Sequence, residues 1–358
     1  MATIGYDLTF VSSMEGKTGE EVFALGLLQG LYGIGMAPYI VVFSTDAMKK
    51  QLQKAYPGLH VVEVKRTGKS FYKTKLRKYI RKNPVDIMYY PHIHRYMTVN
   101  LPCPTAATAH GMESKEVSAR DRRKTLSRLR KIDRIAAAGS MVRDEIISKH
   151  RHLTEERLQV ICNPLVDIRA GVEIVLKKKF ILSVNSDSAQ KNLIAILKSF
   201  RKIKNEIPHD LVVIGDIDEK GRAYRYIRRA GLNDRVIVTG RISRDILFGY
   251  YRNSDLFVNA SRYRGFGYTP LEAMACGGRV LSVRMPAITD PEGIDCDEYI
   301  NNPHNYSEIA NKMLIVLYKE IDRDYLKKRA ERLMEIYGLE KASRRYAEFL
   351  GMGEKNDR

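Results

Sequence analysis

The residues from Ser261 to Gly278 combine a glycine-rich turn with an acidic residue near the start of an expected helix. Gly265 and Gly267 have no Cβ, so the backbone there can take φ > 0 and come close to a ligand. The first N–H groups of a helix lack intrahelical acceptors and carry partial positive charge, which suits phosphate. Pro270 fits a helix start, and we expect Glu272 within the first turn, where its carboxylate can accept two ribose hydroxyls. This segment therefore predicts a site for the phosphates and ribose of a nucleotide.

A second glycine-rich loop, Gly16-Lys17-Thr18-Gly19, follows the first expected strand. The phosphate-binding loop of nucleoside triphosphatases needs a glycine five residues before its Gly-Lys pair, where this chain has Val11. The triphosphatase interpretation is therefore weak, and a tight turn that requires glycine remains the alternative.

Histidines offer a further candidate. His110 follows the apolar strand expected at Thr105–Ala109, and its imidazole can donate or accept a hydrogen bond near neutral pH. A satisfied structural histidine is the alternative. His92 and His94 lie on an expected loop, and we interpret both as non-catalytic.

Taken in order, these segments resemble the retaining glycosyltransferases of family 4, which have the GT-B fold. Residues Gly265 to Gly277 follow the family's signature of two acidic residues around a Gly-Phe-Gly turn, with Glu272 at the second acidic position and Arg264 at the first. Lys191 matches a family lysine, whereas Ser186 stands where an arginine is usual.

The resemblance implies a donor site for a nucleoside diphosphate sugar, with no metal and no other cofactor. In this sequence its binding residues would be Gly16, Gly19, Lys191, Gly240, Arg241, Gly265, Phe266, Gly267, Tyr268, Thr269 and Glu272. The residues expected at the chemistry are His110 beside the sugar, Glu272 on the ribose and Arg264.

Arg264 and Ser186 depart from the family pattern together. Losing one charged hydrogen bond costs about 1.5–3 kcal/mol, so the arginine missing at Ser186 needs a substitute. Arg264 is one candidate, but it fits equally well with recognition of an acidic sugar or with a site that binds without transfer. A binding or scaffold protein is therefore the alternative to a hexosyltransferase.

The length of 358 residues suits two domains, and both halves alternate strand-like and helix-like segments. We expect an α/β protein of the GT-B class with two Rossmann-like domains, at residues 1–168 on the acceptor side and 169–338 on the donor side. Residues 339–358 would form a helix that crosses back to the first domain, with a short tail.

The net charge of +19 is concentrated between Lys65 and Arg134, where 19 Lys and Arg face 5 Asp and Glu. Clustered cations suit anionic lipid or nucleic acid. Apolar positions at helical spacing from Phe71 to Ile80 fit either a membrane-surface helix or one packed on its own domain. No long apolar run, secretory signal or paired cysteine spacing is evident. We expect a cytoplasmic protein, peripheral at the membrane, with a glycan or lipid-linked acceptor, and with nucleic acid as the less favoured partner.

Overall fold

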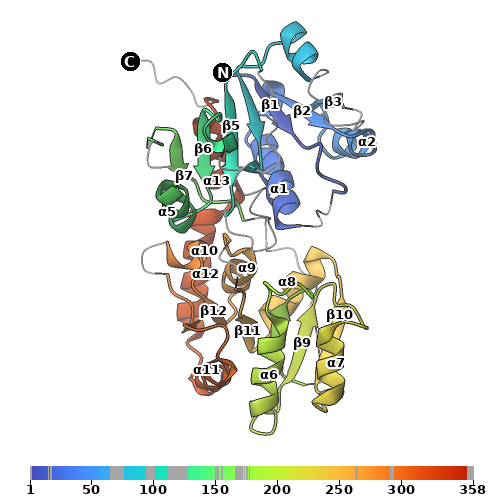
Figure 1. Ribbon diagram of the computed structural model, residues 1–358, viewed down its shortest axis with the longest axis vertical. Coiled ribbons are helices and arrows are strands. Elements are labelled where there is room, and N and C mark those ends of the chain that lie inside the picture. Colours follow the sequence, from blue (N-terminus) through green and yellow to red (C-terminus); the bar gives the residue numbers. More distant parts are fainter. Residues whose placement is uncertain are drawn as a thin grey trace. The chain divides into compact units, whose positions relative to one another are not determined.

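The computed structural model describes residues 2–14, 16, 18–64, 76–93, 101–111, 127–149, 153–154, 156–165, 172, 174, 176, 178–262, 265–290 and 294–352. The chain divides into two compact units. Unit 1 comprises Met1–Val166 and Tyr337–Arg358, and unit 2 comprises Asp167–Ile336. We describe each unit by itself (Figure 1).

Unit 1 contains a seven-stranded sheet in the order β3-β2-β1-β4-β5-β6-β7, and all of its strand pairs are parallel. The strands are β1 (Ile4–Asp7), β2 (Ile40–Ser44), β3 (His60–Glu63), β4 (Ile87–Tyr90), β5 (Thr105–Ala109), β6 (Arg134–Ala137) and β7 (Leu158–Val160). Its helices include α1 (Gly19–Gly33), the 3-10 turn Ala37–Tyr39, α2 (Asp46–Ala55), α5 (Ser140–Lys149) and α13 (Leu339–Phe349). The central strands β1, β4 and β5 are buried throughout, as expected of a parallel sheet covered on both faces.

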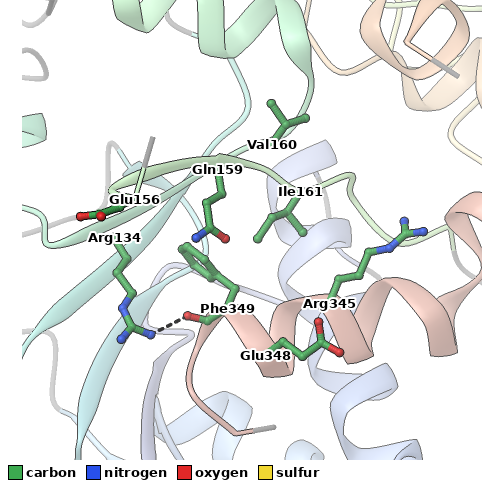
Figure 2. Close-up of a pocket in the computed structure, with 8 residues that line it drawn as sticks. All are labelled: Arg134, Glu156, Gln159, Val160, Ile161, Arg345, Glu348 and Phe349. Carbon is green, nitrogen blue, oxygen red and sulfur yellow. Dashed lines mark hydrogen bonds between the residues drawn. The ribbon is translucent and has the colours of Figure 1, made fainter. Parts of the chain in front are cut away.

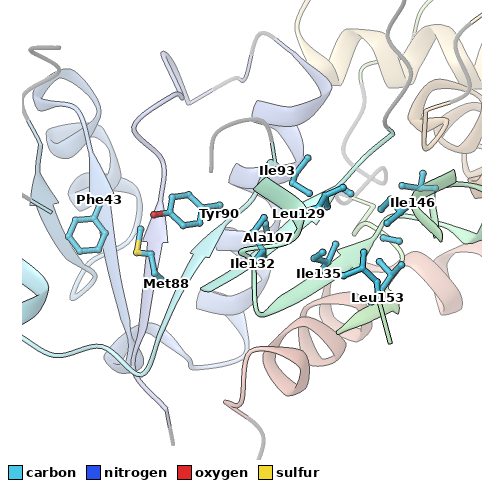
Figure 3. Packing of buried hydrophobic residues seen from close by; sticks show 14 of the residues in the cluster. Phe43, Met88, Tyr90, Ile93, Ala107, Leu129, Ile132, Ile135, Ile146 and Leu153 are labelled. Carbon is cyan, nitrogen blue, oxygen red and sulfur yellow. The ribbon is translucent and has the colours of Figure 1, made fainter. Parts of the chain in front are cut away.

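The core on one face of this sheet joins side chains from several strands to the elements that cover them. Figure 3 shows Phe43 of β2, Met88 of β4 and Ile135 of β6 in one cluster with Ile146 of α5. Leu76 and Ile80, on a helix whose described part is 76–82, are buried in the same cluster. The described apolar positions of this helix therefore face the core of unit 1. This agrees with a helix packed on its own domain, the second of the two interpretations of the apolar positions from Phe71 to Ile80.

The C-terminal helix α13 packs against α1 within unit 1 (Figure 1). Gly30 of α1 permits this approach, because a Cβ there would lie 1.9 Å from Ser343 Oγ. Tyr346 of α13 is fully buried and its ring lies 5.6 Å from that of Phe23. Burial raises the pKa of the Tyr346 hydroxyl, which is within 3.4 Å of Thr108 Oγ1.

Unit 2 contains a six-stranded parallel sheet in the order β10-β9-β8-β11-β12-β13. The strands are β8 (Phe180–Val184), β9 (Asp210–Ile214), β10 (Val236–Gly240), β11 (Leu256–Asn259), β12 (Val280–Val283) and β13 (Glu298–Ile300). The helices are α6 (Leu193–Ile203), α7 (Arg222–Arg229), α8 (Arg244–Asn253), α9 (Tyr268–Ala275), α10 (Pro286–Thr289), α11 (Tyr306–Tyr318) and α12 (Arg323–Tyr337). The prediction of two parallel α/β sheets is confirmed, although the sequence patterns had not indicated α7 or β13.

Candidate functional site

The strand order of each unit defines a topological switch point, where ligands of open α/β sheets bind beyond the carboxyl ends of the strands. In unit 2, successive strands run from β8 to β9 and β10 in one direction and from β11 to β12 and β13 in the other. The loops after β8 and β11 therefore leave the same edge side by side. These loops carry Lys191 and the Gly265–Gly267 turn, two of the segments that the sequence singled out.

Hydrogen bonds join these two loops. The carbonyl of Gln190 accepts from the backbone N–H of Arg262 at 2.7 Å and from Ser261 Oγ at 3.2 Å. Asn192, in the left-handed region at φ 58°, donates from Nδ2 to the carbonyl of Ala260 at 3.0 Å. Lys191 is therefore held at the base of the loop that leads to the glycine turn.

Lys191 is half-buried. Burial lowers its pKa, and the nearby Glu272 carboxylate opposes that shift. Because a bound anion such as phosphate favours the charged form of a partly buried lysine, Lys191 is suited to pair with it.

The Gly265–Gly267 turn leads directly into α9. Gly267 has φ 100° and caps the helix, and a Cβ on it would lie 2.8 Å from the Cβ of Met285. Phe266 is buried and Gly265 lies beside it, while Tyr268 and Thr269 in the first turn of α9 are half-buried. Their backbone N–H groups are among those that a helix leaves without intrahelical acceptors.

The expectation that Glu272 lies in the first helical turn is wrong. Since Gly267 in its left-handed conformation starts α9 at Tyr268, Glu272 is the fifth helical residue and lies one turn further along. Its side chain is 3 % exposed.

Both carboxylate oxygens of Glu272 have partners on α8. Arg244 Nη2 donates to Oε1 at 2.7 Å, and the Tyr251 hydroxyl donates to Oε2 at 3.2 Å. Burial, and after it the Glu272 carboxylate, raises the pKa of Tyr251. An ionised carboxylate offers about four lone-pair sites, so these two donors leave acceptor capacity for a ligand.

The sequence interpretation missed Arg244 and Tyr251. The available signal was their spacing with Phe248, because residues at i, i+4 and i+7 share one helix face. The sequence alone did not indicate that this face of the helix would contact Glu272.

The loops after β9 and β10 adjoin the same edge of unit 2. Gly215, at φ 135°, donates its N–H to the carbonyl of Gly240 at 2.9 Å. A Cβ on Gly215 would lie 1.9 Å from the carbonyl oxygen of Asn185, so only glycine permits this contact between loops. Gly240 has φ 73°, and the exposed Arg241 places Nε 3.5 Å from an oxygen of Asp216.

Of the two residues that depart from the family pattern, Ser186 and Arg264, the structure describes only Ser186. Ser186 is half-buried, and its hydroxyl accepts from the N–H of Ser188 at 3.4 Å. Arg264 lies outside the described residues, so its predicted roles stay predictions.

In unit 1 the switch point lies between β1 and β4, and Gly16 is in the loop after β1. Gly16 has φ 66°, and Gly19 is the first residue of α1. Thr18 caps this helix by accepting from the N–H of Glu21 at 3.3 Å, which is the first half of a capping box. The loop thus has the tight turn and helix start that the sequence indicated.

His110 follows β5, next to that switch point, and both of its ring nitrogens are engaged. Nε2 is 2.9 Å from the carbonyl of Pro91, which can only accept, so Nε2 carries the proton. Nδ1 then accepts from Asn163 Nδ2 at 3.0 Å. The ring also packs edge-on against Phe23 at 4.4 Å.

His92 stacks on His110 with ring centroids 5.5 Å apart and an interplanar angle of 13°. It is buried, and its Nε2 lies 2.8 Å from an oxygen of Glu20. The sequence interpretation had set His92 aside as non-catalytic. The structure makes it part of the support for His110.

A cavity of about 560 Å³ lies elsewhere in unit 1, between β7 and α13. Figure 2 shows its lining, where Arg134 donates to the carbonyl of Phe349 at 2.8 Å and Arg345 and Glu348 project from α13. None of the residues predicted for the donor site lines it.

Comparisons with known proteins find sequence similarity mainly in unit 2. Residues 167–333 match the family model described as glycosyl transferases group 1. The serotype-specific mannosyltransferase WbdA of Escherichia coli is 31% identical over 143 residues, which are 38% of this chain and 17% of WbdA. The alpha-monoglucosyldiacylglycerol synthase of Streptococcus pneumoniae is 30% identical over 164 residues, 46% of this chain and 33% of the synthase. The chain thus matches a third or less of the length of these relatives.

Solved structures resemble the whole chain. Anabaena HepE in complex with UDP gives a TM-score of 0.75 at 16% identity and covers 98% of this chain and 100% of its own. A glycosyltransferase from Rickettsia africae gives 0.76 at 16% identity, with 99% of each chain covered. The fold is therefore GT-B, as the sequence predicted.

Among the described residues, no helix combines the length and apolar character that a membrane span requires.

Proposed function

We propose that this protein is a glycosyltransferase that takes a sugar from a nucleoside diphosphate sugar. The observation that carries the proposal is the joining of Lys191 and the Gly265–Gly267 turn at the switch point of unit 2, with Glu272 beside them. Lys191 and the first amides of α9 suit a diphosphate, and Glu272 suits a ribose. HepE, which has the same fold, was solved with UDP and with UDP and glucose.

We propose transfer with retention of configuration and without a metal. Developing charge on the leaving diphosphate would be stabilised by Lys191 and the helix amides, which is electrostatic stabilisation of a leaving group. Arg264 is our candidate for the further cation that Ser186 does not supply. If Arg264→Glu left the dissociation constant (Kd) for the nucleotide unchanged, this role for Arg264 would be wrong.

We propose a glycan or lipid-linked acceptor, which unit 1 would hold. The names of the relatives include a mannosyltransferase and a glucosyldiacylglycerol synthase, and both are consistent with it. The cations between Lys65 and Arg134 remain our candidate for contact with anionic lipid, although Leu76 and Ile80 face the core.

Two measurements, made one after the other, test the proposal. Calorimetry or thermal unfolding with UDP, GDP and ADP identifies the nucleotide, because a ligand that binds only the folded state raises its apparent stability. The matching nucleoside diphosphate sugars are then incubated with lipid and glycan acceptors in the presence of EDTA. We expect acceptor-dependent release of nucleoside diphosphate with an α-linked product. Binding of nucleotide without release by any donor would instead indicate a binding protein.

A further inference from the structure

Helix α8 carries three side chains on one face, and two of them reach α9. Arg244, Phe248 and Tyr251 are spaced at i, i+4 and i+7, and α8 packs on α9. Phe248 lies under the Arg244 guanidinium at 5.1 Å. Arg244 and Tyr251 then reach one oxygen each of the Glu272 carboxylate, at 2.7 and 3.2 Å.

Arg244 differs from two buried or half-buried arginines of unit 2, Arg235 and Arg279. Arg235 donates to Asp210 and to the carbonyls of Lys204, Ile207 and His209. Arg279 donates to the carbonyls of Asp255, Val316 and Lys319. These guanidinium groups tie loops together through the backbone, as structural arginines do.

Arg244 makes a single charged hydrogen bond among the described residues, and its acceptor is Glu272. Its buried Nε has no hydrogen-bond partner there. Apart from the Phe248 ring, the contact that Arg244 makes among the described residues is therefore with the carboxylate at the candidate site, where it can orient that group.

We propose that Arg244, assisted by Tyr251, positions Glu272 for the two ribose hydroxyls and thereby sets a preference for ribonucleotides over deoxyribonucleotides. This inference rests on the proposed function, since it requires a nucleotide at the unit 2 switch point. The number of acceptor positions supports the proposal. Each carboxylate oxygen of Glu272 accepts one hydrogen bond from α8 and keeps one further lone pair, and the two ribose hydroxyls can donate to these two lone pairs. Arg244 and Tyr251 are positioning residues, because they act through Glu272.

The test measures Kd values by calorimetry for UDP, 2′-deoxy-UDP and 3′-deoxy-UDP, with GDP or ADP and their deoxy forms substituted if the wild type binds those instead. For the wild type we expect about tenfold weaker binding on loss of either hydroxyl, the effect of one charged hydrogen bond. In Arg244→Met the Kd for UDP should rise about tenfold, while the Kd of the deoxy form that already lacks the hydroxyl bound to the Arg244-paired oxygen should change less than twofold.

Matched variants separate positioning from folding. Arg244→Lys restores a cation without the planar fork and should recover part of the preference for the ribonucleotide. Tyr251→Phe removes one neutral hydrogen bond and should weaken UDP binding about threefold, which keeps the test possible if Arg244→Met unfolds. Arg252→Met, an exposed arginine on the same helix, should leave the preference unchanged.

The two failures are distinguishable. Equal weakening of UDP and its deoxy forms in Arg244→Met, or a wild type without preference for the ribose, overturns the role of Arg244 and leaves the proposed function intact. A wild type that binds none of the three nucleotides overturns both.

Discussion

Glu272 in unit 2 and His110 in unit 1 lie near the switch points of their own sheets, and among the described residues each hydrogen-bonds at least two polar groups of its unit. The two side chains differ in how many hydrogen-bonding positions remain for a ligand. The carboxylate has about four acceptor positions, so Arg244 and Tyr251 leave room for a ligand. A neutral imidazole has one donor and one acceptor, and the Pro91 carbonyl and Asn163 use both. A carboxylate with two hydrogen-bond donors is held in place and can still accept hydrogen bonds from a ligand. An imidazole with two partners can bind a ligand only if it gives up one of them.

The strongest test of the comparison removes the charge of Glu272. In Glu272→Gln we expect the Kd for the nucleotide to rise about 100-fold, because charged hydrogen bonds to ribose are lost and Arg244 loses its counter-charge. Calorimetry measures this effect. Glu298→Gln, which breaks the ion pair with Lys312 in the same unit, is the control and should leave the affinity unchanged. Retained affinity in Glu272→Gln would remove the carboxylate from the site.

The second test removes the cation of Lys191, which lies near Glu272. Lys191→Met should weaken nucleotide binding about 10- to 30-fold, through the loss of one charged hydrogen bond. The same variant should unfold at a temperature no lower than the wild type without ligand, because it removes a desolvated charge. Lys204→Met, on a half-buried lysine that donates to the carbonyl of Gly231, is the matched control. A lower unfolding temperature with normal affinity would make Lys191 structural.

His110 tests the other side of the comparison. In His110→Ala we expect the free energy of unfolding to fall by about 2 kcal/mol, since two hydrogen bonds are lost. Nucleotide affinity should stay within twofold, and turnover should fall about tenfold if the ring exchanges a partner for the sugar. Asn163→Ala disturbs the same network without removing the imidazole. Equal turnover in the wild type and in His110→Ala would show that the histidine is structural.

The smallest expected effect is a pH dependence. Burial lowers the pKa of Lys191, so the free protein loses this proton at a lower pH than an exposed lysine would. Bound phosphate favours the ammonium, and affinity should therefore fall severalfold as pH rises toward the ordinary lysine pKa of about 10.4, with proton uptake on binding. Calorimetry in buffers of different ionisation enthalpy measures the uptake. Lys191→Met should abolish it, and a persistent uptake would assign the proton to another group.

Local patterns carried the sequence interpretation furthest in unit 2. The glycines at 265 and 267 and the acid at 272 are recognisable because their chemistry belongs to the residue types and their spacing, whereas the lysine at 191 was singled out by the family resemblance. Glu272 was misplaced within α9, because the left-handed turn at Gly267 begins the helix at Tyr268 and puts Glu272 beyond the first turn. The apolar stripe that includes Leu76 and Ile80 was ambiguous, because a helix against a core and a helix against a membrane need the same spacing.

The sequence by itself determined the alternation of strands and helices, and with it the α/β class, and it supplied the residue types that suit a nucleotide. Only the tertiary structure decided which loops share an edge, because strand order depends on pairing between segments far apart in the chain. It also decided the partners of the two compared residues. Arg244 reaches Glu272 across 28 positions and Asn163 reaches His110 across 53, contacts that helix and strand packing create and that local spacing does not encode.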